Sequence, residues 1–143
     1  AYDPVAKWTV PLVAGRATAR CAAALLDKLI AEGPFRIEGI QVDGGSEFRA
    51  EFEDACRERN LCLFVLPPKR PPLNGHVERA QGSWRYEFYG VEDLPSRLKP
   101  LQLRIDAFAH RFNHTRPHQA LGDLTPAEYL STISQEIAPS HMG

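Results

Sequence analysis

The sequence contains no apolar run long enough to cross a bilayer, and its first residues do not show the pattern of a signal peptide. It has only three cysteines and no Cys-x-x-Cys spacing, which predicts reduced thiols rather than a disulfide framework. Internal repeats, low-complexity tracts, and helix-turn-helix and zinc-finger patterns are absent as well. These absences argue against membrane-spanning, disulfide-rich and repeat proteins, and they predict a cytoplasmic protein without a membrane partner.

A strong net charge is also lacking, since the 143 residues carry a net charge of −1. Hydrophobic content of 43% and charged content of 24% are ordinary for one globular domain. The charges are nevertheless unevenly distributed. Residues 69–118 hold 9 basic and 5 acidic side chains, whereas residues 119–143 hold 3 acids and no Lys or Arg. A surface that faces phosphate is therefore expected in the middle block, the alternative being an ordinary mixed surface.

The first part of the chain predicts a strand, a helix and a second strand. Residues 6–13 have strand-like composition. Thr18 is placed to cap a helix that ends at Gly33, and residues 35–42 read as a short apolar strand.

A second amphipathic helix and a further strand follow. The helix is expected to end near Asn60, and its apolar face holds Phe48, Phe52, Ala55 and Cys56. Residues 61–66 are a continuous apolar run, which is typical of a strand buried on both faces. Strand, helix and strand with short connections favour a parallel α/β unit.

The second half of the chain predicts a loop and three helices. Residues 67–74 hold four prolines and two cations, which predicts a rigid, exposed loop before a helix over 77–89. The next helix ends at Pro117, and its apolar face holds Leu101, Ile105, Phe108 and Phe112. Thr125 opens a Thr-Pro-Ala-Glu capping box, which predicts a last short helix.

Two acids stand where metal-dependent chemistry would need them. Asp43 directly follows the strand predicted over 35–42, and Glu78 stands early in the helix predicted over 77–89. Ligands of open α/β sheets bind beyond the carboxyl ends of the strands, and magnesium prefers hard oxygen ligands. The pair therefore predicts a metal site for phosphodiester chemistry, in which two ions would clamp the attacking and leaving oxygens. The ordinary alternatives are a turn acid and a solvated helix acid.

Three ordered segments carry a resemblance to a known family: VDGGSEF, PPLNGHVERAQGSWRYEFY and FNHTRPHQALGDLTPAEYL. From Asp3 to Leu130 the chain resembles the catalytic core of bacterial insertion-sequence transposases of the retroviral-integrase type. This resemblance implies an α/β, RNase H-like fold of three layers with a mixed sheet. It also implies cleavage of DNA 3′ ends and their joining to target DNA, with two Mg²⁺ or Mn²⁺ ions. The last two of the family's three acids stand about 35 residues apart, and Asp43 and Glu78 are separated by 35.

The resemblance also assigns residues by position. Asp43 matches the second acid and Glu78 the third, so these two are the expected catalytic and metal-binding residues. Asn74 and Gly75 match the Asn-Gly before that glutamate. The downstream signature is matched by Asn113, Arg116, Pro117 and His118. The expected DNA contacts are Lys69, Arg70, Asn74, Arg79, Arg85, Arg116 and His118, and Arg111 is a further candidate for phosphate contact.

The chain departs from the family at the first acid. In relatives that acid lies some twenty residues before an Asp-x-x-Ser-Arg element, which residues 3–7 resemble in degenerate form. Asp3 is therefore not expected to be the first catalytic acid. We expect that the first strand and most of the second are absent from this chain, which would then bind metal weakly and be inactive by itself. Open strand edges in the middle of the sheet would favour a dimer or a strand exchange.

The resulting prediction is one domain over residues 1–143. Residues 1–92 would form the sheet and the catalytic-helix region, and residues 93–143 a C-terminal helical signature region. The expected partners are DNA, as element ends and target, and further copies of the chain, without a small-molecule cofactor. The resemblance to bacterial transposases also implies a nucleoid-associated location. Two alternatives remain: a non-catalytic DNA-binding or oligomerisation module of the same fold, and an RNase H-like nuclease that cuts without joining.

Two further groups of side chains have competing interpretations. His110, His114 and His118 are spaced by four, as zinc ligands can be, but Pro117 breaks the helix and no Cys pattern completes a site, so zinc is not expected. Aromatic residues on the predicted glutamate helix would either meet bases or pack, and packing is expected for at least half of them: Trp84, Tyr86, Phe88 and Tyr89.

Overall fold

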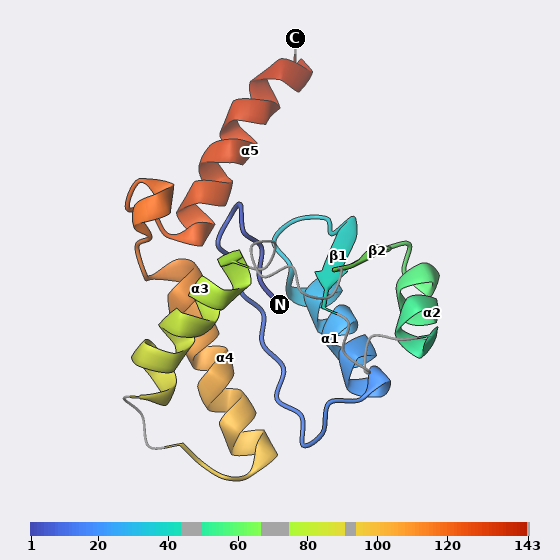
Figure 1. Cartoon of the computed structure of the whole chain (residues 1–143). Coiled ribbons are helices and arrows are strands. Elements are labelled where there is room, and N and C mark those ends of the chain that lie inside the picture. The colour runs from blue at the N-terminus through green and yellow to red at the C-terminus, as the bar shows by residue number, and fades with distance from the viewer. Residues whose placement is uncertain (44–49, 67–74, 91–93, 143) are drawn as a thin grey trace.

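The computed structural model describes residues 1–43, 50–66, 75–90 and 94–142, and the side chains of these ranges except 75–78 and 135–142. Figure 1 shows the elements. In chain order they are helix α1 (Ala19–Glu32), strand β1 (Gly39–Val42), helix α2 (Ala50–Glu58), strand β2 (Cys62–Val65), helix α3 (Gly75–Trp84), π-helix η3 (Arg85–Tyr89), helix α4 (Leu98–His114), 3-10 helix η4 (Gln119–Leu121) and helix α5 (Pro126–Met142).

A first hydrophobic cluster lies between α1, α2 and the two-stranded sheet. β1 and β2 are parallel, with Gly39 opposite Cys62 and Val42 opposite Val65, which confirms the predicted parallel α/β unit. The buried members of the cluster come from both helices and the segment before β2: Leu26, Phe52, Ala55, Cys56 and Leu61. Because side chains alternate along a strand, one face of the sheet meets the helices, through Ile40, Val42 and Leu63.

The ends of α1 follow from its sequence. The Thr18 hydroxyl accepts a hydrogen bond from the Cys21 amide at 3.2 Å, as expected of the cap. At the other end the Gly33 amide donates to the Leu29 carbonyl at 2.7 Å. A Cβ at Gly33 would lie 2.5 Å from that carbonyl oxygen, so this close approach requires glycine.

The prediction that the second strand is buried on both faces is wrong for the described part of the chain. Phe64 is 61% exposed and Val65 is 50% exposed. The apolar run of residues 61–66 shows only that no polar side chain interrupts the strand, and it carries no information on which layers cover it. The strand predicted over 35–42 is also shorter, since only Gly39–Val42 is paired.

A second hydrophobic cluster joins α3, η3 and α4, which lie side by side in Figure 1. Phe88, Ile105, Phe108 and Phe112 are its buried members. The Trp84 ring centroid lies 4.5 Å from that of Phe108, and the centroid of Phe88 lies 5.1 Å from it. Both predicted helices are therefore confirmed. The structure adds that α3 widens into a π-helix at its end, where the Gly90 amide donates to the Arg85 carbonyl at 2.9 Å.

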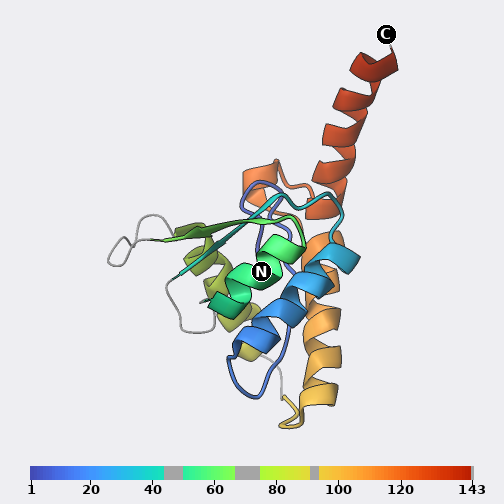
Figure 2. The same ribbon diagram turned by 90° about the vertical axis from the view of Figure 1, so that its right-hand side faces the viewer.

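The N-terminal segment, residues 1–13, lies between α1 and α4 (Figures 1 and 2). The strand predicted over 6–13 is wrong, because the segment forms only an isolated antiparallel bridge between Tyr2 and Thr9. Around this bridge the segment bonds to itself, as the Asp3 amide does to the Trp8 carbonyl at 2.8 Å, and other backbone groups bond helix side chains. Asn113 bonds both backbone groups of Thr9, and the Gln102 carbonyl oxygen accepts from the Val13 amide at 2.7 Å.

The same segment is fastened to α1 by a lysine. The Lys28 ammonium donates to the Pro11 carbonyl and, at 2.6 Å, to Asp106 of α4. Gln102 donates to the same carboxylate oxygen at 2.9 Å. The segment therefore connects the two hydrophobic clusters through polar contacts on both of its sides.

The chain after α4 follows the predicted capping signals. Helix α4 ends at His114, within three residues of Pro117. The Thr125 hydroxyl accepts from the Glu128 amide at 3.1 Å, and the Glu128 carboxylate accepts from the Thr125 amide at 3.0 Å, which confirms the capping box. Helix α5 is longer than the short helix predicted and extends away from the rest of the molecule (Figure 2). None of the helices in the described ranges is long and apolar enough to cross a membrane.

Candidate functional site

Asp43 directly follows Val42, the last residue of β1, and its side chain is exposed. Because β2 runs parallel to β1, both strands end at the same edge of the sheet. Asp43 therefore stands at the edge where ligands of α/β folds bind.

Glu78 lies in the first turn of α3, the helix that follows β2 in the chain. Its side chain lies outside the described residues, as do Lys69, Arg70 and Asn74. The structure thus gives both acids the elements predicted for them. That their carboxylates share a metal ion stays a prediction, and carboxylate oxygens are the ligands that Mg²⁺ and Mn²⁺ prefer.

Among the residues whose side chains the structure describes, which do not include Glu78, no group of three His, Cys, Asp or Glu gathers as a metal site would. Asp3 instead stabilises a turn, since its carboxylate accepts a hydrogen bond from the Ala6 amide at 2.7 Å. Of the three histidines, the rings of His110 and His114 lie 4.4 Å apart, whereas His118 packs on Phe112 at 4.6 Å. Neither Asp3 nor His118 is therefore placed in such a group by its described contacts.

Two of the predicted DNA contacts, Arg79 and Arg85, are exposed on the same helical path as Glu78. Burial raises the pKa of Tyr2, as does Asp3, while the positive charges of Arg79 and Arg116 oppose that rise. Arg79 and Arg85 therefore give the helix that carries Glu78 two exposed cations.

Arg116 forms a bidentate ion pair with Glu87 of η3. Its Nε donates to Oε1 at 3.0 Å and to Oε2 at 2.8 Å, and its Nη2 also donates to Oε1. The predicted contact of Arg116 with phosphate stays a prediction, but the structure gives its guanidinium a protein carboxylate as partner. Sequence reasoning missed Glu87. In the sequence Glu87 is only one of five acids in the basic block of residues 69–118, and it precedes Arg116 by 29 residues.

His118 is 9% exposed. Its Nε2 lies 3.4 Å from the Phe112 carbonyl oxygen, and its Nδ1 lies 3.2 Å from Nη1 of Arg116. Burial lowers the pKa of His118, and the neighbouring Arg116 lowers it further. The predicted DNA contact of His118 stays a prediction, whereas its role in packing is evident.

The aromatic residues of α3 and η3 divide into two pairs. Trp84 and Phe88 belong to the second hydrophobic cluster, which confirms packing for half of them. Tyr86 and Tyr89 are 76% and 53% exposed. Only the two tyrosines are accessible to a partner.

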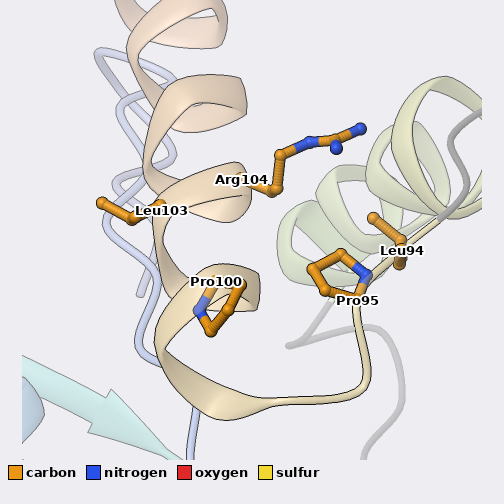
Figure 3. Close-up of a pocket in the computed structure, with 5 residues that line it drawn as sticks. All are labelled: Leu94, Pro95, Pro100, Leu103 and Arg104. Atoms are coloured by element: carbon orange, nitrogen blue, oxygen red, sulfur yellow. The ribbon is translucent and has the colours of Figure 1, made fainter.

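A shallow cleft of about 550 Å³ lies at the start of α4, as Figure 3 shows. The Arg104 side chain extends from α4 toward α3 in this view. The cleft is lined by Leu94, Pro95, Pro100, Leu103 and Arg104. This lining is apolar with one cation, so it lacks the carboxylates that a magnesium site requires.

Comparisons with known proteins agree with this arrangement. A family model described as "Integrase core domain" matches residues 61–126. The chain is 24% identical over 111 residues to "Putative integrase ORF3" of Spiroplasma virus SpV1-C74, which covers 68% of this chain and 30% of that protein. It is 27% identical over 95 residues to the "Insertion element IS407 uncharacterized 31.7 kDa protein" of Burkholderia multivorans (strain ATCC 17616 / 249), covering 66% and 34% respectively. The chain thus spans about a third of the length of the curated relatives it matches.

The fold is shared with solved structures. The catalytic core domain of BIV integrase superposes with a TM-score of 0.71 at 20% identity, covering 95% of this chain and 86% of that one. The HTLV-2 integrase catalytic core domain, in complex with magnesium in a trimeric form, gives a TM-score of 0.67 at 16% identity, covering 90% and 80%. At this identity the likeness establishes the fold, which is RNase H-like. The family model, the two sequence relatives and the shared fold thus make this chain similar to integrase and transposase core domains.

Proposed function

We propose that this chain is the catalytic core of an enzyme that cleaves DNA and joins its 3′ ends to target DNA with divalent metal ions. The observation that carries the proposal is the placement of Asp43 at the carboxyl end of β1, with Glu78 on the helix after the parallel strand β2. The magnesium complex of the HTLV-2 integrase core, which has a similar fold, supports the choice of metal. The partners that this proposal includes are DNA and further copies of the chain.

In this mechanism the carboxylates of Asp43 and Glu78 would hold the divalent ions, whose chemistry when bound would be the activation of a water or a 3′ hydroxyl and the stabilisation of the leaving oxygen. Exposed Arg79 and Arg85 bind DNA phosphates and orient the strand along α3 and η3. In the joining step a new phosphorus–oxygen bond forms as another breaks, so the number of phosphodiester bonds is unchanged.

The two acids make an incomplete site by themselves. Asp3 is bonded within its own turn, and the described residues hold no cluster of three metal-binding side chains. We therefore propose that the third carboxylate comes from outside the described residues, and that this chain alone binds metal weakly and does not turn over.

A Mn²⁺ titration of this chain, followed by electron paramagnetic resonance, tests the metal site. Weak binding is expected for the unaltered chain and should be lost in Asp43→Asn and in Glu78→Gln. Glu51→Gln is the matched control, because Glu51 is an exposed acid on α2. If both variants bind Mn²⁺ as the unaltered chain does, these carboxylates do not hold the metal. A separate strand-transfer assay of the full-length protein with pre-cut DNA ends distinguishes an enzyme that joins DNA from a nuclease that only cuts it.

The second candidate is a non-catalytic DNA-binding or oligomerisation module of the same fold. The exposed apolar side chains of β2, Phe64 and Val65, favour it, because such a strand can recruit a partner. This candidate predicts that Asp43→Asn and Glu78→Gln leave DNA affinity and oligomeric state unchanged. Fluorescence anisotropy with a labelled duplex and analytical ultracentrifugation measure the two quantities.

A further inference from the structure

The ion pair between Glu87 and Arg116 connects two parts of the chain that lie 29 residues apart. Glu87 belongs to η3, which continues α3, and Arg116 stands two residues after the end of α4. The side chains are 36% and 34% exposed, so water screens the pair only in part. A guanidinium that bonds both oxygens of a carboxylate fixes the relative orientation of the two groups as well as their distance.

Arg116 is itself held from two further sides. Its guanidinium carbon lies 5.6 Å from the centroid of the Phe112 ring, and Nη1 lies 3.2 Å from Nδ1 of His118. His118 is fixed in turn, because its backbone amide donates to the Leu124 carbonyl at 3.0 Å. Arg116 is therefore fixed relative to the end of α4, and its ion pair in turn fixes the Glu87 carboxylate.

The ring contacts between α3, η3 and α4 are apolar, since Trp84 and Phe88 meet Phe108. Apolar contacts stabilise the association of two helices but are less directional than a bidentate ion pair, so the pair adds a constraint on how one helix is turned against the other. A turn by one residue rotates an α-helix by about 100°, so it would present a different face of the helix that carries Glu78.

We infer that Glu87 and Arg116 are positioning residues that fix the helix α3–η3 onto α4 and thereby set the rotation of the helix on which Glu78 stands. Nine residues separate Glu78 from Glu87, which is about 13 Å along the helix axis at the α-helical rise. The hydrogen-bonded helix transmits the constraint over that distance. The effect on metal binding rests on the proposed function, whereas the effect on α3 does not.

Two measurements on this chain test the inference. Amide hydrogen exchange of residues 79–84 reports the fixation of α3, and Mn²⁺ affinity reports its consequence at the candidate site. The variants are Glu87→Gln, Arg116→Gln, Arg116→Lys and the charge-swapped pair Glu87→Arg with Arg116→Glu. We expect Glu87→Gln and Arg116→Gln to speed exchange of the α3 amides at least tenfold, with α1 unchanged, and to weaken Mn²⁺ binding at least fivefold. Arg116→Lys should behave like Arg116→Gln in both α3 exchange and Mn²⁺ affinity, because an ammonium lacks the planar fork. The charge-swapped pair should bring α3 exchange part of the way back to that of the unaltered chain.

Arg59→Gln is the matched control, since Arg59 forms a bidentate pair with Asp27 on another part of the molecule. It should leave α3 exchange and Mn²⁺ affinity unchanged. Unchanged α3 exchange in Glu87→Gln and Arg116→Gln would overturn the inference. So would an equal rise in α1 and α3, which would indicate only a general loss of stability. If the unaltered chain binds no Mn²⁺ and the variants still exchange their α3 amides faster, the role of the ion pair in fixing α3 is supported and the proposed metal site is refuted.

Discussion

Replacing Asn113 by Ala should destabilise the fold by an amount set by two buried hydrogen bonds. The Asn113 amide donates to the Thr9 carbonyl at 2.8 Å and its carbonyl oxygen accepts from the Thr9 amide at 2.9 Å. Asn113 and Thr9 are 4% and 6% exposed, so both backbone groups of Thr9 would be left without a partner. Each such buried group costs about 1–3 kcal/mol. Because water can reach part of the vacated space, we expect a total loss of about 2–4 kcal/mol in the free energy of unfolding.

Urea denaturation followed by far-ultraviolet circular dichroism measures this loss. A loss of this size corresponds to a fall in melting temperature of roughly 5–15 °C for a domain of this length. Lys99→Ala is the control, because Lys99 is exposed on the same helix and its removal should change the free energy by less than about 0.5 kcal/mol. If Asn113→Ala loses no more than this control, the amide does not fasten residues 1–13 to α4.

Three further predictions concern protonation, capping and burial. Burial and then Arg116 lower the pKa of His118 below its ordinary value of 6.5, so the unfolded chain takes up more protons in acid. Stability should therefore be complete above pH 6.5 and fall as the pH drops below it, and His118→Gln should weaken that fall in urea titrations between pH 5 and 8. Thr125→Ala removes the capping box and should cost about 0.5–2 kcal/mol, with faster amide exchange at the start of α5 as the local readout; unchanged exchange there would contradict the capping role. Phe64→Ser should cost less than about 1 kcal/mol because the ring is 61% exposed, whereas Phe52→Ala, at 2% exposed, should cost about 3–5 kcal/mol; similar losses would mean that Phe64 is covered in solution.

Local signals in the sequence predicted much of the fold. The cap at Thr18, the stop at Gly33 and the capping box at Thr125 depend on residues within a few positions of one another, and all three are confirmed. The apolar face of α4 followed from its periodicity for the same reason. Interactions between residues that are one or two helical turns apart leave a recognisable pattern in the sequence.

Contacts between distant residues left no such pattern. The strand predicted over 6–13 failed because the segment folds back on itself and bonds Asn113 and Gln102, and no local sequence pattern near either side chain indicates that role. The exposure of Phe64 was missed because composition does not reveal which layers surround a strand. At the candidate site the sequence placed Asp43 and Glu78 on the correct elements, yet it gave no sign that Glu87 would hold Arg116.

The attachment of residues 1–13 also has a consequence for how the protein is made. Thr9 and Asn113 are 104 residues apart, and a ribosome adds about 5–20 residues per second. Roughly 5–20 s therefore pass between synthesis of the segment and synthesis of the amide that fastens it. During that interval Thr9, which is buried in the finished fold, has no Asn113 to bond. The nascent chain thus leaves the backbone groups of Thr9 to water until α4 has been translated.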